Sequence, residues 1–460
     1  MMLSSVPARG DDPPGTPAAL CWPEPPLRFA PRGGNPPTHR PLTGPEGPVR
    51  WAGNHRLAVT AWVVAVLIGA VPQVNNQVRT GHGRCFPGGV RIEKVDAASA
   101  PDAARALYDI YRAGAPVDDP GAPAMSFRVF GVRMRCGWCG EPRESWLARD
   151  NAGAGAGAAA GDGSAAGDGS AAGDGSTAGD GSRAGAGAPG DGVVGGYTLE
   201  LPERENRDRA ALEVLVAPAH RRAGTGTALL RHAADRARAL GRVTLTAEVM
   251  AGTPGDGFAQ ASGAAVQLTE ARRTLDVSAI PPGYLAELRA SVKAAAAGYE
   301  VLDWSGDAPG GYLDGMAELN QMMGDAPHGG GEEVLSWDAA RVREVEKLHA
   351  TMGLRHYSVA ARAEATGELA GLTELSVDPA DPEWGHQEMT VVSRAHRGHR
   401  LGLLLKVAML ELLADREPQI RSVLTYNAES NQHMIAVNEA LGHRVSGRLR
   451  SLTLAADAVP

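Results

Sequence analysis

The stretch that decides the fold runs from a strand through a glycine loop into a helix. It comprises ALEVLV at residues 211–216, APAHRRAGTG at residues 217–226 and TALLRHAADRARAL at residues 227–240. The first segment is rich in apolar and β-branched residues, as strands are. The last segment ends at Gly241 and carries apolar residues at helical spacing, namely Leu230, Ala233, Ala234, Ala237 and Leu240. The sequence therefore predicts a strand, a loop and a helix in this order, with a further strand at residues 243–249.

The same order of elements returns in the second half of the chain. Residues 367–375 and 388–392 are expected to form strands, and residues 396–402 form a loop before a leucine-rich helix. The two loops align at three positions: His220 with His396, Arg221 with Arg397, and Gly226 with Gly402. Such self-similarity indicates a tandem duplication.

The segments around the second loop complete an α/β pattern. Strands are expected at residues 299–304, 421–426 and 448–454, with a hairpin at residues 356–377, and helices at residues 312–323, 338–352 and 431–441. The alternating charges of the helix at 338–352 predict a solvated face. Mixed strands with helices on both faces predict the fold class α/β, as two tandem mixed-sheet α/β sandwiches.

The first repeat is expected at residues 90–277 and the second at residues 278–460. Residues 151–192 repeat the hexad AAGDGS, which has almost nothing to bury, so we expect a disordered insertion. Both flanks, residues 144–150 and 193–201, favour strands, so the insertion lies in a hairpin turn. Calcium binding is not expected, because calcium-binding glycine-aspartate repeats also need a large apolar residue.

Residues 1–89 are rich in proline and glycine and predict a disordered extension. Within them, LAVTAWVVAVLIGAV at residues 57–71 is shorter than the about 20 apolar residues that cross a bilayer. A long proline-rich segment precedes this run, unlike the short basic region of a secretory signal. We expect no membrane attachment, with a membrane anchor as one alternative and a translation start near Val90 as another.

Composition narrows the class of partner. The formal charge of −8 leaves no domain-wide basic face for nucleic acid, so small molecules or proteins are the expected partners. Four cysteines are too few to staple a secreted chain of this size, which predicts a cytoplasmic location. Cys136 and Cys139 form a single CxxC motif with no second pair, so no metal site is predicted.

The loop at residues 221–226 has the character of an anion-binding site. A helix N-terminus offers unpaired N–H groups and partial positive charge, and glycine lets a phosphate approach the backbone. A Rossmann fingerprint would need glycine where Leu229 stands, and a Walker loop would need lysine where Thr227 stands. Both nucleotide-binding motifs are therefore excluded.

At these residues the chain resembles the GNAT (GCN5-related N-acetyltransferase) superfamily, whose acetyl-CoA signature is Arg/Gln-x-x-Gly-x-Gly/Ala after a strand. Arg221, Gly224 and Gly226 match its fixed positions. The resemblance covers most of residues 90–460 as two repeats, similar to actinobacterial tandem acetyltransferases of the mycothiol-synthase type. It implies acetyl-CoA as co-substrate, with pantetheine along Val214, Leu215 and Val216, and pyrophosphate on Arg221, Arg222, Ala223, Gly224, Thr225, Gly226 and Thr227.

The second repeat departs from the signature. Arg400 stands where the first glycine is expected, which leaves Arg397 and Gly402 matched. Asn431 occupies a position that touches the cofactor in the family. Asn438 stands where the family often has a tyrosine general acid, and Ala259 holds that place in the first repeat. The resemblance therefore implies that each repeat lacks a different part, and that the first holds CoA more tightly.

Acetyl transfer to an amine requires the neutral amine, which an alkyl ammonium of pKa about 10.4 rarely supplies near neutral pH. Carboxylates or histidines on the strand before the loop are the natural proton acceptors. His386 and Glu388 share one face of that strand in the second repeat by period-two alternation, so they are the predicted catalytic residues. The first repeat offers Glu213. Solvated polar residues on a strand are the alternative for each.

The leading hypothesis is an enzyme that moves an acyl group, expected to be acetyl, from acyl-CoA to a primary amine of a small molecule. The hypothesis from another class is a catalytically silent CoA-binding regulator or scaffold, which the missing tyrosines favour. Neither the acceptor nor the oligomeric state can be predicted from the sequence.

Overall fold

The computed structural model describes residues 84–85, 89–96, 100–137, 140–150, 192–325 and 332–459. The apolar run at residues 57–71, the rest of the extension before residue 84, the repeats at residues 151–191 and Cys139 lie outside these ranges. Among the helices that the structure describes, none has the length and apolar character needed to cross a membrane.

Within the described ranges, thirteen strands form one sheet. They are β1 (Arg84–Cys85), β2 (Val90–Val95), β3 (Arg143–Asp150), β4 (Val193–Glu200), β5 (Arg209–Val216), β6 (Thr244–Met250), β7 (Ala265–Asp276), β8 (Tyr299–Ser305), β9 (Arg355–Ala363), β10 (Leu369–Val377), β11 (Trp384–Val392), β12 (Ser422–Ala428) and β13 (Arg444–Ala455). The α-helices are α1 (Pro101–Asp118), α2 (Phe127–Arg135), α3 (Thr225–Ala239), α4 (Pro254–Ala261), α5 (Tyr284–Val292), α6 (Leu313–Met322), α7 (Ala339–Met352), α8 (Leu401–Arg416) and α9 (Gln432–Ala440).

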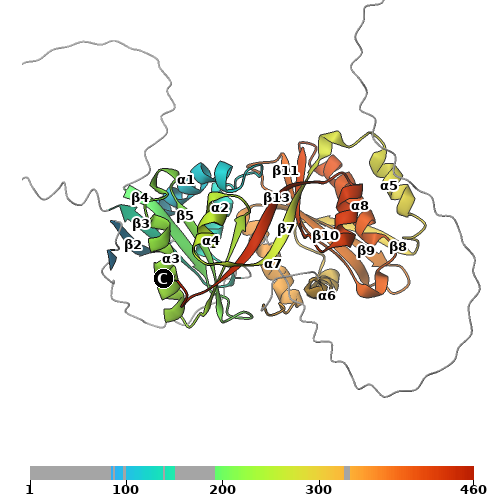
Figure 1. The fold of residues 1–460 in the computed structure, drawn as a ribbon. Helices are drawn as coiled ribbons and strands as arrows, with labels where there is room; N and C mark the ends of the chain where they lie inside the picture. Colours follow the sequence, from blue (N-terminus) through green and yellow to red (C-terminus); the bar gives the residue numbers. More distant parts are fainter. Residues whose placement is uncertain are drawn as a thin grey trace, which may run out of the picture. The chain divides into compact units, whose positions relative to one another are not determined.

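The strand, loop and helix predicted from residues 211–240 are confirmed as β5 and α3, and their second copies as β11 and α8 (Figure 1). The strands on either side of the glycine-rich repeats are confirmed as a hairpin, because β3 pairs antiparallel with β4 from Arg143 opposite Glu200 to Arg149 opposite Val193. The order of elements, β2-α1-α2-β3-β4-β5-α3-β6-α4-β7, recurs as β8-α6-α7-β9-β10-β11-α8-β12-α9-β13. The fold is therefore the predicted pair of mixed α/β repeats.

The two repeats exchange their last strands, which the sequence pattern does not reveal. The sheet order is β1-β2-β3-β4-β5-β6-β13-β7-β12-β11-β10-β9-β8. Thus β13, the end of the second repeat, pairs with β6 of the first, and β7 of the first pairs with β12 of the second. The boundary at residues 277 and 278 stays a prediction about the sequence repeats, while the sheet itself is continuous across them.

Helices cover both faces of each repeat. In the first, α1 and α2 pack their apolar side chains on one face, with Leu147 at 0% exposure, and α3 packs on the other, around Leu229 and Ala233. In the second, α6 and α7 cover one face and α8 with α5 the other. This burial of apolar area stabilises both layers. The last turn of α7 also joins the core beneath α1 and α2 through Leu348 and Met352.

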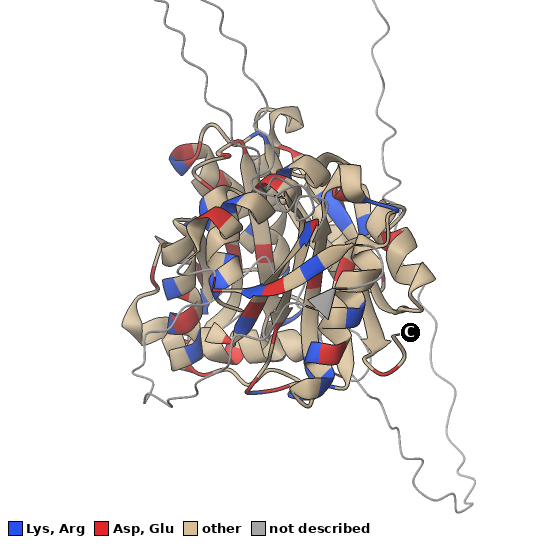
Figure 2. Ribbon diagram, turned by 90° about the vertical axis from the view of Figure 1, so that its left-hand side faces the viewer, with Lys and Arg blue, Asp and Glu red and all other residues tan. Residues whose placement is uncertain are grey.

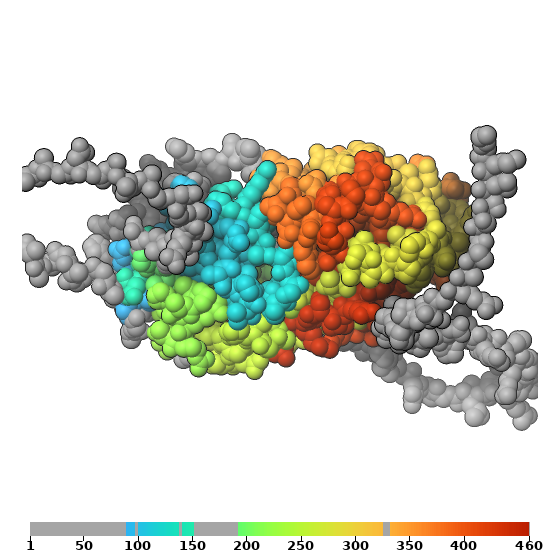
Figure 3. Space-filling view, turned by 90° about the horizontal axis from the view of Figure 1, so that it is seen from above, coloured from blue at the N-terminus to red at the C-terminus, as the bar shows by residue number. Residues whose placement is uncertain are grey.

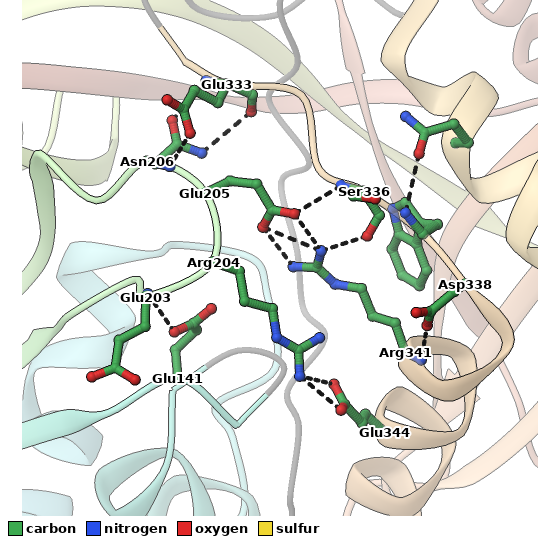
Figure 4. A network of polar contacts seen from close by, with 12 residues as sticks. Glu141, Glu203, Arg204, Glu205, Asn206, Glu333, Ser336, Asp338, Arg341 and Glu344 are labelled. Atoms are coloured by element: carbon green, nitrogen blue, oxygen red, sulfur yellow. Dashed lines mark hydrogen bonds and ion pairs between the residues drawn. The ribbon is translucent and has the colours of Figure 1, made fainter.

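Polar contacts join the two repeats where α2 meets α7. Arg128 Nε donates to the Thr351 carbonyl at 3.1 Å. In the space-filling view, the cyan part of the first repeat adjoins the orange part of the second (Figure 3). In the network of Figure 4, Arg341 binds Glu205 at 2.9 Å and Arg204 binds Glu344 at 2.7 Å.

The prediction that the charged residues of the helix at 338–352 are solvated is wrong for two of them, Arg341 and Glu346. Arg341 is 2% exposed because it reaches the other repeat, and Glu346 is 6% exposed because it accepts the Ala308 N–H. Elsewhere acidic and basic residues are interspersed along the ribbon (Figure 2).

Candidate active site

Each repeat opens between two parallel strands. β5 and β6 pair only from Arg209 to Ala211, and β11 and β12 pair only from Trp384 to His386. Beyond these residues β5 continues to pair with β4, up to Gly195 opposite Val216. The predicted pantetheine strand, Val214, Leu215 and Val216, therefore lies at an opening where its second edge is not engaged by β6.

The loop after β5 brings a helix N-terminus to this opening. A 3-10 turn at Pro218–His220 is followed by two left-handed residues, Arg222 with φ 63° and Gly224 with φ 87°, and α3 begins at Thr225. The first N–H groups of a helix have no intrahelical acceptor. A Cβ added to Gly224 would meet no atom within 4 Å, so the loop surface here is open. The geometry suits a bound anion.

Arg221, predicted to hold pyrophosphate, has protein partners in this structure. Its Nε donates to the Val216 carbonyl at 3.2 Å, and its two terminal nitrogens bind the Asp118 carboxylate at 3.0 and 2.6 Å. The side chain thus fastens the loop to β5 and to the end of α1. Arg222, Ala223 and Gly224 are exposed beside it, while Thr225 is buried.

The second loop repeats this backbone with different residues. A 3-10 turn at Arg394–His396 is followed by Gly398 with φ 90° and Arg400 with φ 55°, and α8 begins at Leu401. Arg397 Nε donates to the Val392 carbonyl at 3.4 Å, as Arg221 Nε does to Val216. Arg400 therefore takes up the left-handed conformation of Gly224, so the lost glycine leaves the loop's course intact.

The helix after the second opening carries a buried polar network. Asn431, expected to touch the cofactor, accepts the Met434 N–H at 3.2 Å and caps α9. Asn438, at the position of the family's tyrosine, is fully buried and accepts Lys406 Nζ at 2.7 Å. Burial lowers the pKa of Lys406 to about 7.

A small pocket adjoins the opening in the first repeat, on the sheet face covered by α1 and α2. It is lined by the polar residues Arg133, Arg143, Thr198 and Glu213, and by Leu107, Met125, Phe130, Met134, Tyr197 and Leu215. Arg143 binds Glu213 at 3.2 Å and Glu200 at 3.8 Å. Glu213, which the sequence offered as the only carboxylate of this repeat's strand, thus lies beside both the pocket and the pantetheine strand.

On the corresponding face of the second repeat, His349, His356, Glu374 and Glu388 form a buried group, called here the histidine–glutamate cluster. Glu388 lies 3.6 Å from His349 and 3.8 Å from His356, and Glu374 lies 3.9 Å from His356. The imidazole rings of His349 and His356 stack with centroids 4.4 Å apart. The predicted catalytic residue Glu388 is therefore brought among histidines from other elements.

Burial and charge act in opposite directions within the cluster. Burial raises the pKa of Glu388, but His349 and His356 together lower it by a larger amount. The pKa of Glu388 therefore lies below its ordinary value. Burial raises the pKa of Glu374 to about 7. Burial lowers the pKa of His386, the other predicted catalytic residue, to about 4, so this imidazole is neutral near pH 7.

Sequence reasoning missed His349 and His356. His349 belongs to the last turn of α7, and His356 to the start of β9, with a left-handed Gly353 reversing the chain between them. The reversal brings both rings within 4 Å of the Glu388 carboxylate of β11. The sequence pattern that could have indicated them is a pair of histidines on both sides of a helix-ending glycine. This pattern alone does not predict a cluster, because Glu388 lies far away in the sequence.

Comparison with known proteins gives a consistent picture. The model of the acetyltransferase (GNAT) family matches residues 178–258 and 330–443. A tandem GNAT protein from the clavulanic acid biosynthesis pathway is 28% identical, covers 80% of this chain and 98% of its own, and superposes with a TM-score of 0.62. No curated protein sequence matches the chain.

Two more distant structures share the fold. A GCN5-related N-acetyltransferase from Sphaerobacter thermophilus is 14% identical, with a TM-score of 0.50, and covers 81% of this chain and 97% of its own. A GCN5-related glucosamine N-acetyltransferase region of a fungal multi-domain GH3 β-N-acetylglucosaminidase is 12% identical, with a TM-score of 0.51, over 84% of this chain and 40% of its own.

Proposed function

Because the chain belongs to the GNAT acetyltransferase family and carries its fold twice in tandem, we propose that it is an acyl-CoA-dependent N-acyltransferase. The proposed reaction moves acetyl from acetyl-CoA to a primary amine of a small molecule, in the cytoplasm. The observation that carries the proposal is the loop of the first repeat. It leads from β5, which separates from β6 after Ala211, through the exposed Gly224 to the N-terminus of α3, and residues of β5 line a pocket.

The first repeat is the proposed CoA site. The pantetheine amides would pair with the free edge of Val214, Leu215 and Val216. The pyrophosphate would lie on the first turn of α3, near Gly224, with Arg222 at the rim. Arg221 would act by holding the loop in place through Asp118, rather than by contacting phosphate. In the second repeat Arg397, Gly402 and Asn431 would hold CoA more weakly, since Arg400 projects from the loop.

The transfer requires a neutral amine and a polarised thioester. The amine nitrogen attacks the thioester carbonyl, a C–N bond forms, the C–S bond breaks and CoA leaves as a thiolate. N–H groups on the free edge of β5 would stabilise the oxyanion. Glu213 faces the pocket and would accept the ammonium proton, directly or through water. Ala259 has no proton to donate, so the second proton that the amine nitrogen loses on becoming an amide would reach the thiolate through water.

A second candidate places the chemistry in the other repeat, with Glu388 and His386 as the proton acceptors predicted from the sequence. Support comes from the burial of both side chains near the end of the β11–β12 pairing. His386 is neutral near pH 7 and can accept a proton, but its pKa of about 4 makes it a weak base.

Thiol release from acetyl-CoA over a panel of small amines tests the proposal. We expect saturable turnover by the full chain, a fall in kcat of at least 10-fold in Glu213→Gln, and near-normal kcat in Glu388→Gln. The reverse pattern would transfer the chemistry to the second repeat. Acetyl-CoA binding by calorimetry without thiol release for any amine would support the silent CoA-binding regulator instead, and absence of binding would reject both.

A further inference from the structure

We infer that the histidine–glutamate cluster of the second repeat is a binding site for a divalent transition-metal ion of the zinc class. The inference goes beyond the proposed acyl transfer, because nothing in that reaction requires a metal. It rests on the geometry of the cluster, on its unpaired atoms and on its contrast with the first repeat.

The ligand atoms converge from three separate elements. His349 comes from α7, His356 from β9 and Glu388 from β11, and one ligand atom of each lies within 4.8 Å of the others. Ligand atoms about 2.0–2.1 Å from a tetrahedral ion are about 3.3 Å apart. The observed separations are 3.6 Å from Glu388 Oε1 to His349 Nε2 and 3.8 Å from Glu388 Oε2 to His356 Nε2, so the side chains would close in on a bound ion.

The same atoms have no hydrogen-bond partner within the described part of the chain. They are both ring nitrogens of His349, Nε2 of His356 and Oε1 of Glu388. The three side chains are 3%, 6% and 7% exposed. An unpaired buried polar group costs about 1–3 kcal/mol, so four such atoms in one place point to a missing ligand. An ion would use one nitrogen from each imidazole and the carboxylate oxygen.

The chemistry of the donors selects the class of ion. Imidazole nitrogen suits Zn²⁺, Co²⁺ and Fe²⁺, whereas Ca²⁺ and Mg²⁺ take oxygen ligands. Glu374, whose Oε1 lies 3.9 Å from His356 Nε2, is placed to supply a fourth ligand. Two histidines with two carboxylates would neutralise a divalent charge in this buried place.

At the position equivalent to His356, the first repeat has a positively charged side chain, Arg143. Arg143 pairs across β3 and β4 with Glu200, as His356 pairs across β9 and β10 with Ser376, so Arg143 and His356 occupy equivalent places. The Arg143 guanidinium binds both Glu213 and Glu200. The cluster of the second repeat has carboxylates but neither arginine nor lysine, and an ion would supply the corresponding positive charge.

A bound ion would also assign a role to Glu388. Its carboxylate would be a ligand and unavailable as a proton acceptor, which agrees with acyl transfer in the first repeat. Metal binding and acyl transfer are measured separately, so either can fail while the other stands.

The test uses the full chain, freed of metal with a chelator and then titrated with Zn²⁺ by calorimetry. Metal content after dialysis is measured in parallel. We expect about one zinc per chain, a rise in Tm with zinc, and tetrahedral Co²⁺ absorption when Co²⁺ replaces zinc.

Variants locate the ion. His349→Asn and Glu388→Gln keep the side-chain size and should each weaken zinc binding at least 10-fold, with the double change His349→Asn/His356→Asn abolishing it. His433→Asn, an exposed histidine of the same repeat, is the matched control and should bind normally. Circular dichroism checks folding, and retained acetyl-CoA binding provides a second check.

Less than a tenth of an equivalent of zinc retained by the folded chain would overturn the inference. So would unchanged zinc affinity in folded His349→Asn and Glu388→Gln, because the ion would then lie elsewhere. Loss of acetyl-CoA binding with intact zinc binding would instead count against the proposed function alone.

Discussion

The two repeats keep the same loop and differ in what lies beneath it. Arg221 and Arg397 both donate to the carbonyl of the last strand residue, and the left-handed positions Gly224 and Arg400 coincide. On the sheet face, however, Arg143 of the first repeat pairs with Glu200 and Glu213, whereas the second repeat has histidines with ring nitrogens that lack a hydrogen-bond partner. Duplication has thus preserved the backbone of the proposed anion-binding loop, while the side chains on the sheet face have diverged.

The largest expected difference between the repeats concerns stability at these equivalent positions. Arg143→Ala leaves Glu200 and Glu213 without their buried partner and should lower the free energy of unfolding by about 3–5 kcal/mol. His356→Ala, in chelator-treated protein, should cost much less, because Nε2 of His356 has no hydrogen-bond partner. Urea unfolding followed by circular dichroism compares them. Equal losses would remove the contrast between the ion-paired Arg143 and the unpaired Nε2 of His356.

The next effect sharpens the difference between the loops. Gly224→Val forces a β-branched residue to φ 87° and places its side chain over the open loop surface. Acetyl-CoA affinity should fall about 5- to 150-fold, which corresponds to 1–3 kcal/mol. Gly367→Val is the matched control, since Gly367 has φ 79° and open space at a hairpin turn. Calorimetry showing the same small change in both variants would disconnect the loop from CoA.

A pH effect separates the helices that follow the two loops. Lys406 of α8 aligns with Leu230 of α3, and burial lowers its folded-state pKa to about 7 from 10.5. Above pH 7 the unfolded chain binds the proton that the folded chain has lost, so stability should rise as pH increases toward 10.5. The rise from pH 7 to 9 is on the order of 2 kcal/mol.

Lys406→Leu copies the first repeat and should flatten this rise, whatever it does to stability at pH 7. The change is measured as the difference in unfolding free energy between pH 7 and pH 9 for the variant and the parent. The neighbouring His443 is neutral in the folded chain between pH 7 and pH 9, since burial, and next the charge of Lys406, lower its pKa to about 3. An unchanged slope would mean that Lys406 stays protonated in the folded chain.

The smallest effect is expected from Arg400→Gly, a substitution that restores the first glycine of the signature in the second loop. Arg400→Gly removes a non-glycine residue from φ 55°, and should stabilise the protein by about 1 kcal/mol. It also clears the side chain from the first turn of α8, so a second, weaker acetyl-CoA site should become measurable. Binding stoichiometry by calorimetry checks this, with Arg416→Gly at the other end of α8 as a control for lost charge. An unchanged stoichiometry would mean that the weak acetyl-CoA binding of the second repeat is due to its pocket and not to Arg400.

The sequence by itself determined the local structure and the duplication. Residues 211–240 specify strand, loop and helix because their apolar spacing, glycines and helix-ending Gly241 act within one turn or one strand. The same reasoning located β3 and β4 on both sides of the glycine-rich repeats, and it predicts an anion site at the loop. It also found Glu388 on its strand, because side chains alternate along a strand with a period of two.

Only the tertiary structure decided how these pieces meet. The exchange of β7 and β13 between the repeats depends on pairing between residues far apart in the chain, such as Leu449 with Met250. The partner of Arg221 is Asp118, on a helix whose approach no local pattern encodes. Likewise Arg341 has the spacing of a solvated charge but is buried against Glu205. His349, His356 and Glu388 become one cluster because packing brings α7, β9 and β11 together, and side-chain identity alone does not specify that packing.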